Sequence, residues 1–220
     1  MPFEVIYADP PWKFGNERTG GSLKSGAGQK YQVLDLPVIQ RLAVPAVTAR
    51  NAVLFLWVPT ALKFSHGGTV MAAWGFEYIT TVYWEKTGRR GMGFWFRNQV
   101  EELLVAQRRG GYVEPFRCQL PNIVHHPPGQ HSEKPEAFRQ LIETATGKIS
   151  RRRNLELFGR RQVPGWTVIG DQVTGQDIRT DLRRLALDGT LFQEGGSDGM
   201  GGTGEPAESP QAMPGGGCEA

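Results

Sequence analysis

The chain has 220 residues, of which 39% are hydrophobic and 10% aromatic, and its 25 Lys and Arg residues against 22 Asp and Glu residues give a net charge of +3. At roughly 150 residues per domain, this length allows one large α/β domain with an appendage and excludes two substantial domains. The content of large apolar side chains excludes disorder of the whole chain.

Short apolar runs rich in β-forming residues alternate with segments of helical spacing over residues 1–174. Several of the apolar runs are continuous, which is typical of strands that are covered on both faces of a parallel sheet. In chain order, we expect strands at 3–7, 52–57, 78–84, 102–106 and 154–158, and helices at 37–42, 60–74 and 134–144. This alternation predicts a three-layer α/β fold, with a mostly parallel sheet and helices on both of its faces.

Two long connections and a change of composition mark the rest of the chain. The segments 14–30 and 109–132 are long for a compact domain, and such connections are usually functional or disordered. Helical spacing of apolar residues predicts a C-terminal helical extension over 175–193. Gly, Pro, Ser and acidic residues then predominate, which predicts a disordered tail over 194–220.

The most informative motif is the tetrapeptide Asp9-Pro10-Pro11-Trp12, at the carboxyl end of the first expected strand. Open α/β sheets place their ligands at this end. Two successive prolines fix the backbone, so the Asp9 carboxylate and the Pro10 carbonyl form a rigid pair of acceptors for the two hydrogens of adenine's amine. Trp12 offers a ring face to the base. The alternative is a proline turn with Asp9 as a cap and Trp12 in the core.

An ordered set of blocks resembles the S-adenosylmethionine-dependent adenine N6-methyltransferases that carry a DPPW motif. The family includes the eukaryotic mRNA adenosine methyltransferase and bacterial and phage DNA-modifying relatives. The blocks are IYADPPW (6–12), LFLWV (54–58), WGFEYITTVYWEK (74–86), GFWFRNQVEELLVAQR (93–108), HSEKPEAF (131–138), and LELFGRR followed by GWTVIGDQ (155–172). The resemblance covers residues 3–174 and implies a Rossmann-like methyltransferase domain in a permuted motif order. It also implies that Asp9, Pro10, Pro11 and Trp12 are catalytic.

The same resemblance implies a set of cofactor-binding residues for S-adenosylmethionine. Lys134 matches the family lysine that meets the cofactor's carboxylate, and Arg160 matches the arginine beside the ribose. Asp171 and Gln172 match a pair that usually begins with Asn; an Asp accepts hydrogen bonds from ribose hydroxyls but donates none. Gln162 stands where the eukaryotic members have a His-Asn step. Only eight residues precede the DPPW motif, so a cofactor contact that those members make from upstream must be made otherwise.

We therefore expect an enzyme that methylates the N6 amine of adenine in a nucleic acid. DNA is the preferred substrate because the chain resembles the compact bacterial and phage members, while RNA stays open. A duplex substrate would require the target adenine to leave the base stack. One alternative is a catalytically silent nucleic-acid-binding relative. Another is a methyltransferase for small molecules or protein glutamine, whose related signature is Asn-Pro-Pro-Tyr. The intact DPPW argues against both.

Clusters of arginine residues support a nucleic-acid partner. Pairs and triplets of arginine suit a phosphate-bearing ligand, although such groups also simply solvate loop ends. They are Arg89-Arg90, Arg108-Arg109, Arg151–Arg153, Arg160-Arg161 and Arg183-Arg184.

Three further expectations are negative. His125, His126 and His131 do not have a zinc-site spacing, so we expect no metal. Cys118 and Cys218 lie far apart, which argues against a structural disulfide. No run of about 18 apolar residues and no signal peptide is present, so we expect a soluble protein of the cytoplasm, in a bacterial cell or a phage-infected host, that binds no membrane. The sequence leaves the oligomeric state open.

Overall fold

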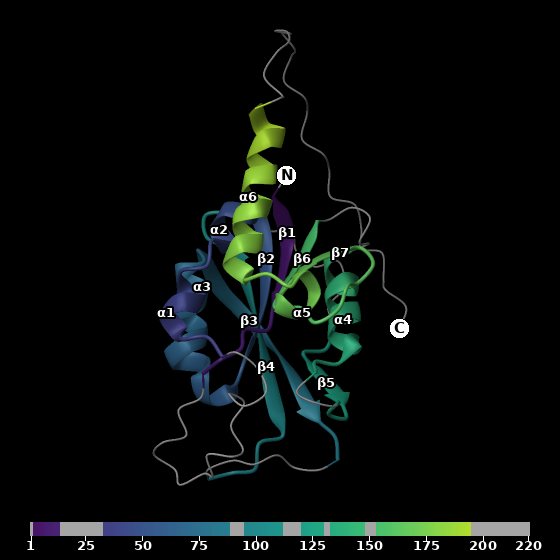
Figure 1. The fold of residues 1–220 in the computed structure, drawn as a ribbon. Helices are drawn as coiled ribbons and strands as arrows, with labels where there is room; N and C mark the ends of the chain where they lie inside the picture. The colour runs from purple at the N-terminus through teal and green to yellow at the C-terminus, as the bar shows by residue number, and fades with distance from the viewer. Residues whose placement is uncertain are drawn as a thin grey trace.

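Seven strands form one sheet in the order β5-β3-β4-β2-β1-β6-β7 (Figure 1). The computed structural model describes residues 2–13, 33–88, 95–111, 120–129, 133–147 and 153–194, with side chains described as far as residue 188. The elements are β1 (Phe3–Ala8), α1 (Leu36–Gln40), α2 (Val44–Val47), β2 (Thr48–Val58), η3 (Thr60–Leu62), η4 (Lys63–Gly67), α3 (Gly68–Ala73), β3 (Phe76–Lys86), β4 (Val100–Arg108), β5 (Ile123–His126), α4 (Glu136–Thr146), β6 (Asn154–Leu157), β7 (Trp166–Ile169), α5 (Asp171–Thr174) and α6 (Ile178–Glu194).

The sheet is mostly parallel, as the sequence predicts. β4 runs antiparallel to both of its neighbours, β2 and β3, and the other four strand pairs are parallel. At the centre, Ile6 of β1 lies opposite Leu54 of β2 on one side and Leu155 of β6 on the other. All residues of β1 except Glu4 are buried, which is the burial that a continuous apolar run predicts.

Alternate residues of the strands build two hydrophobic cores, one on each face of the sheet. Ile6 and Leu54 point into the core that α1, α2, α3 and α6 cover. Tyr7 and Phe55 point into the other core, which α4 and α5 cover. Figure 1 shows these two groups of helices on opposite sides of the sheet. The three-layer α/β, Rossmann-like fold is thus confirmed.

Four elements differ from the sequence expectations. β5 and β7 were not among the expected strands, and β5 lies inside the segment 109–132 that we expected to be a connection. The expected helix 60–74 is instead a 3₁₀ turn, a π-helical turn and a short α-helix. α4 begins at Glu136 because Pro135 has an extended backbone, with φ −59° and ψ 138°.

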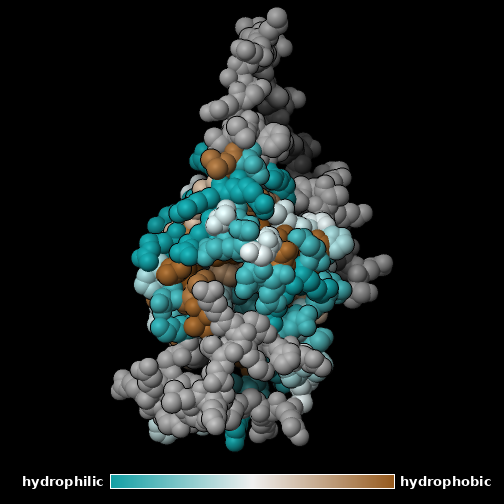
Figure 2. Space-filling view, viewed as in Figure 1, coloured by the Kyte–Doolittle hydropathy of each residue, from teal (hydrophilic) through white to brown (hydrophobic). Residues whose placement is uncertain are grey.

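The surface and the chain ends add little to this picture. On the face that Figure 2 shows, the described residues form a mainly hydrophilic surface with apolar residues in a few small patches. No helix within the described ranges is both long and apolar enough to cross a membrane. α6 continues to Glu194, the residue at which we expected the tail to begin. The other residues of the expected tail, 195–220, lie outside the described residues, as do 14–30, Cys118 and His131. The division into domain, extension and tail stays a prediction.

Candidate active site

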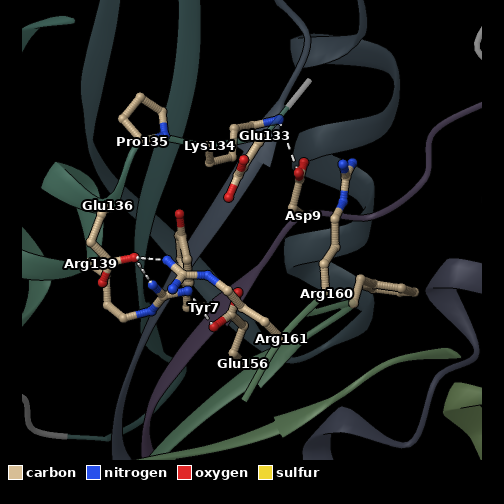
Figure 3. A pocket seen from close by; sticks show the side chains of 11 residues that line it. Tyr7, Asp9, Glu133, Lys134, Pro135, Glu136, Arg139, Glu156, Arg160 and Arg161 are labelled. Atoms are coloured by element: carbon tan, nitrogen blue, oxygen red, sulfur yellow. Dashed lines mark hydrogen bonds and ion pairs between the residues drawn. The ribbon is translucent and has the colours of Figure 1, made fainter. Parts of the chain in front are cut away.

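One edge of the sheet gathers most of the residues that the sequence singled out. β1, β6 and β7 are parallel, so their carboxyl ends meet at the same edge. Asp9 follows β1, Arg160 follows β6 by three residues, and Asp171 follows β7 by two. β4 is antiparallel, so its first residues, including Glu101, start from this edge. Lys134 enters from the segment before α4 (Figure 3).

An ion-pair cluster forms the centre of the site. The Lys134 Nζ lies 3.0 Å from Asp9 Oδ2 and 3.3 Å from Glu101 Oε2. The Lys134 ammonium also lies 5.2 Å from the ring centre of Trp57, and Lys86 forms a second ion pair with Glu101. The Lys134 side chain is 15% exposed and that of Asp9 is 28% exposed. Two carboxylates thus share one mostly buried ammonium at the mouth of the site.

Burial and charge move the pKa values of this cluster in different directions. Burial raises the pKa of Asp9, and the Lys134 ammonium offsets only part of this effect. Burial also acts to raise the pKa of Glu101, but Lys134 and Lys86 together hold it below its usual range. Burial acts to lower the pKa of Lys134, yet the two carboxylates raise it. Lys134 therefore stays charged, while Asp9 holds its proton to a higher pH than an exposed Asp.

The DPPW turn is held rigid from inside the protein. The Pro10 carbonyl accepts a hydrogen bond from the Trp12 backbone N–H at 2.8 Å, which leaves one of its two lone pairs available. The Pro11 carbonyl accepts one from the Leu34 N–H at 2.9 Å. The Trp12 indole donates to the Trp57 carbonyl at 2.9 Å, and the side chain is 6% exposed. Trp12 thus lies in the core, as the alternative interpretation of the motif had it, and its contact with a base stays a prediction.

A pocket beside Asp9 joins some of the predicted cofactor residues. Lys134 and Arg160 line this pocket with Asp9, and the charge of Arg160 reaches the Asp9 carboxyl. Figure 3 shows Arg160 and Lys134 on either side of Asp9. Asp171 and Gln172 begin α5 at the same sheet edge but do not line the pocket, and Asp171 Oδ1 accepts the Gln172 backbone N–H at 2.8 Å. Gln162 is exposed and is also absent from the pocket lining.

The lining also holds residues that the sequence interpretation missed. The Arg139 guanidinium bonds Glu156 at 2.7 Å and pairs with Glu136, while its Nε has no hydrogen-bond partner among the described residues. Burial raises the pKa of Glu156, against the influence of Arg139. A charged residue inside an apolar strand, such as Glu156 in β6, is a sequence signal that could have pointed to it.

The turn after β6 is tight and strained. Phe158, which lines the pocket, has a φ of 64°, and it is the one residue other than glycine with a positive φ in the described ranges. Gly159 follows it, and a Cβ there would lie 2.1 Å from the Val168 Cγ1. The backbone therefore has to pass close to β7 before it delivers Arg160 to the pocket.

No group of three or more His, Cys, Asp or Glu residues that could hold a metal ion occurs in the described parts of the chain. His125 and His126, which the sequence placed in a long connection, are in β5. His125 Nδ1 lies 3.2 Å from Glu85 Oε2, and His126 Nδ1 lies 2.7 Å from the Pro127 carbonyl.

Comparison with known proteins gives consistent matches over the whole sheet. The family model described as MT-A70 matches residues 3–172. The Type II methyltransferase M.MunI of Mycoplasma sp is 31% identical over 192 residues, covering 80% of this chain and 80% of its own. The human N(6)-adenosine-methyltransferase catalytic subunit METTL3 is 28% identical over 184 residues, 79% of this chain but 28% of METTL3. The human N(6)-adenine-specific methyltransferase METTL4 is 28% identical over 191 residues, 78% of this chain and 37% of METTL4.

Proposed function

Because this chain belongs to the MT-A70 family, we propose that it is an adenine N6-methyltransferase that uses S-adenosylmethionine and acts on DNA. The activity follows the names of the relatives, METTL3 and METTL4 among them. DNA is the proposed nucleic acid because the motifs resemble those of the compact bacterial and phage members. The chain spans 80% of M.MunI but only 28% of METTL3.

The observation that carries the proposal is the position of Asp9. Asp9 directly follows β1, a strand inside the sheet, and its carboxylate lines the pocket and lies 3.0 Å from the Lys134 ammonium. The lone pair of adenine's amine is conjugated into the ring, which makes it a poor nucleophile. The Asp9 carboxylate and the free lone pair of the Pro10 carbonyl are two acceptors for the amine hydrogens. Holding both hydrogens orients the nitrogen and favours its attack.

The donor set of the pocket fits the amino-acid end of the cofactor. The Lys134 ammonium suits a carboxylate, and Arg160 stands beside it. Asp171 and Gln172 would accept from the ribose hydroxyls at the same edge, and Gln162 is a further proposed cofactor contact. The cofactor supplies the electrophilic methyl group. Asp9 is placed to accept the proton that the methylated amine gives up, and its raised pKa favours that acceptance.

The test is to express the chain and digest the DNA and RNA of the host to nucleosides for mass spectrometry. We expect N6-methyldeoxyadenosine to rise in DNA and Asp9→Ala to abolish the rise. Asp35→Ala is the matched control, since Asp35 is an exposed carboxylate that also pairs with a lysine, Lys13, at 2.9 Å. A rise confined to RNA would overturn the choice of DNA, and no rise in either would overturn the proposed activity. The cytoplasm of a bacterial cell or phage-infected host is the proposed location.

A further inference from the structure

Three aromatic side chains are almost fully exposed. Phe64 is 90% exposed, Trp95 is 86% exposed and Phe96 is 87% exposed. The other large apolar side chains that lie exposed in the described ranges are between 37% and 67% exposed. Single exposed apolar residues are normal on protein surfaces, but a group of large exposed aromatic rings on neighbouring segments marks an interaction site.

All three rings belong to segments at the edge of the sheet that carries the active site. Phe64 is in η4, shortly after β2 ends at Val58. Trp95 and Phe96 come a few residues before β4, which starts at the same edge because it is antiparallel to β2. The Thr60 hydroxyl donates to the Val100 carbonyl at 3.5 Å and so joins the two segments. We call these three side chains the aromatic rim.

The backbone that carries Phe64 is fixed on both sides. Just before it, the Lys63 Nζ lies 2.6 Å from the buried Glu102 carboxylate of β4. Just after it, His66 meets the ring of Trp12 edge to face, with 6.1 Å between the ring centres. The ring of Phe64 therefore stands in solvent on a backbone that is already ordered, two residues before the His66 contact with the DPPW turn. Little conformational entropy is lost when a flat ligand stacks on such a ring.

We propose that the aromatic rim stacks on unpaired nucleobases that neighbour the target adenine. This inference rests on the proposed function. An enzyme that works on a base must have it out of the stack, and the bases beside it then lose a stacking partner. Aromatic side chains replace that partner for any base, because every base has a π-face. Arg97 follows the rim directly and is exposed, which places a positive charge beside it for the phosphates.

The test measures binding of a fluorescent single-stranded 12-mer oligodeoxynucleotide by anisotropy, together with an abasic strand of the same length. We expect Phe64→Ala and Trp95→Ala each to weaken binding of the normal strand by at least about fivefold. Affinity for the abasic strand should stay unchanged, as should the slope of affinity against salt. Phe64→Trp and Trp95→Phe keep a stacking ring and should restore binding.

Two controls separate stacking from charge and from general loss of apolar surface. Arg97→Ala should lower affinity for both strands and reduce the salt slope by about one. Leu187→Ala removes an apolar side chain that is 67% exposed on α6, and it should change neither affinity. In Figure 1 this helix extends beyond the end of the sheet at which β1 begins, away from the active edge.

The outcomes distinguish this inference from the proposed function. The proposal for the aromatic rim is overturned if Phe64→Ala and Trp95→Ala bind the normal strand as tightly as the wild-type protein does. It is also overturned if these variants lose as much affinity for the abasic strand as for the normal strand. Either result leaves the proposed function intact if the wild-type protein methylates DNA. Failure of the wild-type protein to bind either strand also overturns the rim, while the methylation of host DNA decides the proposed function separately.

Discussion

In the proposed reaction, Asp9 can take up a proton from the amine only while it is ionised, and its neighbours decide at which pH that holds. Burial raises its pKa, Lys134 lowers it and Glu101 raises it. Because folding raises the pKa of Asp9, protonated Asp9 stabilises the folded state at low pH. This stabilisation is lost as the pH rises through the folded-state pKa. Activity should instead fall as the pH falls through the same pKa.

The first prediction removes the shared cation. In Lys134→Met, Asp9 and Glu101 keep their burial but lose the ammonium, so the pKa of Asp9 should rise further. The acid limb of kcat/KM should move up by about one pH unit or more. Affinity for S-adenosylmethionine, measured by calorimetry, should fall about tenfold through loss of one charge-assisted contact. The exposed Lys13→Met is the control, and an unmoved acid limb would contradict the assignment.

The second prediction removes the like charge. Glu101→Gln keeps the size of the side chain but takes away a carboxylate that raises the pKa of Asp9. The acid limb should then move to lower pH, by about half a unit. Opposite shifts in the two variants are the signature of the cluster, because general damage to the fold would move both profiles in the same way. The readout is the pH profile of single-turnover methylation.

Among the elements, the junction of η4 and α3 has two adjacent glycines with different surroundings, Gly67 and Gly68. A Cβ on Gly67 would lie 2.9 Å from the Leu104 Cδ1 and within 3.3 Å of both Val58 methyls. A Cβ on Gly68 would have nothing within 4 Å, and its φ of −60° is helical. Gly67 thus allows the π-helical turn to pack closely against β2 and β4, whereas Gly68 is the first residue of α3 and makes no such close contact.

These surroundings give a matched pair of substitutions. Gly67→Ala should lower the free energy of unfolding by about 1–3 kcal/mol through overpacking. Gly68→Ala should raise it by about 0.5–1 kcal/mol through reduced flexibility of the unfolded chain and better helix propensity. Urea unfolding followed by circular dichroism measures both. Equal effects of the two variants would show that the close packing at η4 is not as described.

The elements that the sequence could not predict are the ones fixed by distant neighbours. β1 and β2 are apolar runs that fit only a strand covered on two faces, so the sequence predicts them. β5 has just four residues, two of them histidines, and it becomes a strand by pairing with β3 at residues far away in the chain. The π turn likewise depends on contacts with β4. The local sequence therefore predicts neither β5 nor the π turn.

For the molecule as a whole, the sheet order predicts how stability is distributed. β1 and β2 lie inside the sheet and are buried on both faces, whereas β5 is at an edge with alternate residues exposed. Hydrogen exchange followed by mass spectrometry should find the amides of β1 and β2 slowest, and those of β5 faster by at least about tenfold. Protection of β5 equal to that of β1 would mean that the molecule opens only as one unit.

The candidate active site was predictable in part for a similar reason. Asp9 follows a recognisable strand and has a distinctive motif, and Lys134 belongs to a matching block. Glu101 reaches the site from the start of a reversed strand, and the sequence does not say that β4 is reversed. The sequence does not point to Arg139 either, because its place in the pocket follows from its hydrogen bond to Glu156 of β6, 17 positions away.

The left-handed backbone at Phe158 has one more implication. Glycine would occupy that conformation without the penalty of roughly 1–3 kcal/mol that a side chain incurs. The chain nevertheless keeps a bulky ring there, facing the pocket. The fold thus accepts local backbone strain to keep a ring that lines the pocket and packs against the core. A glycine introduced at this point should therefore relieve the strain and still weaken binding of the small-molecule donor.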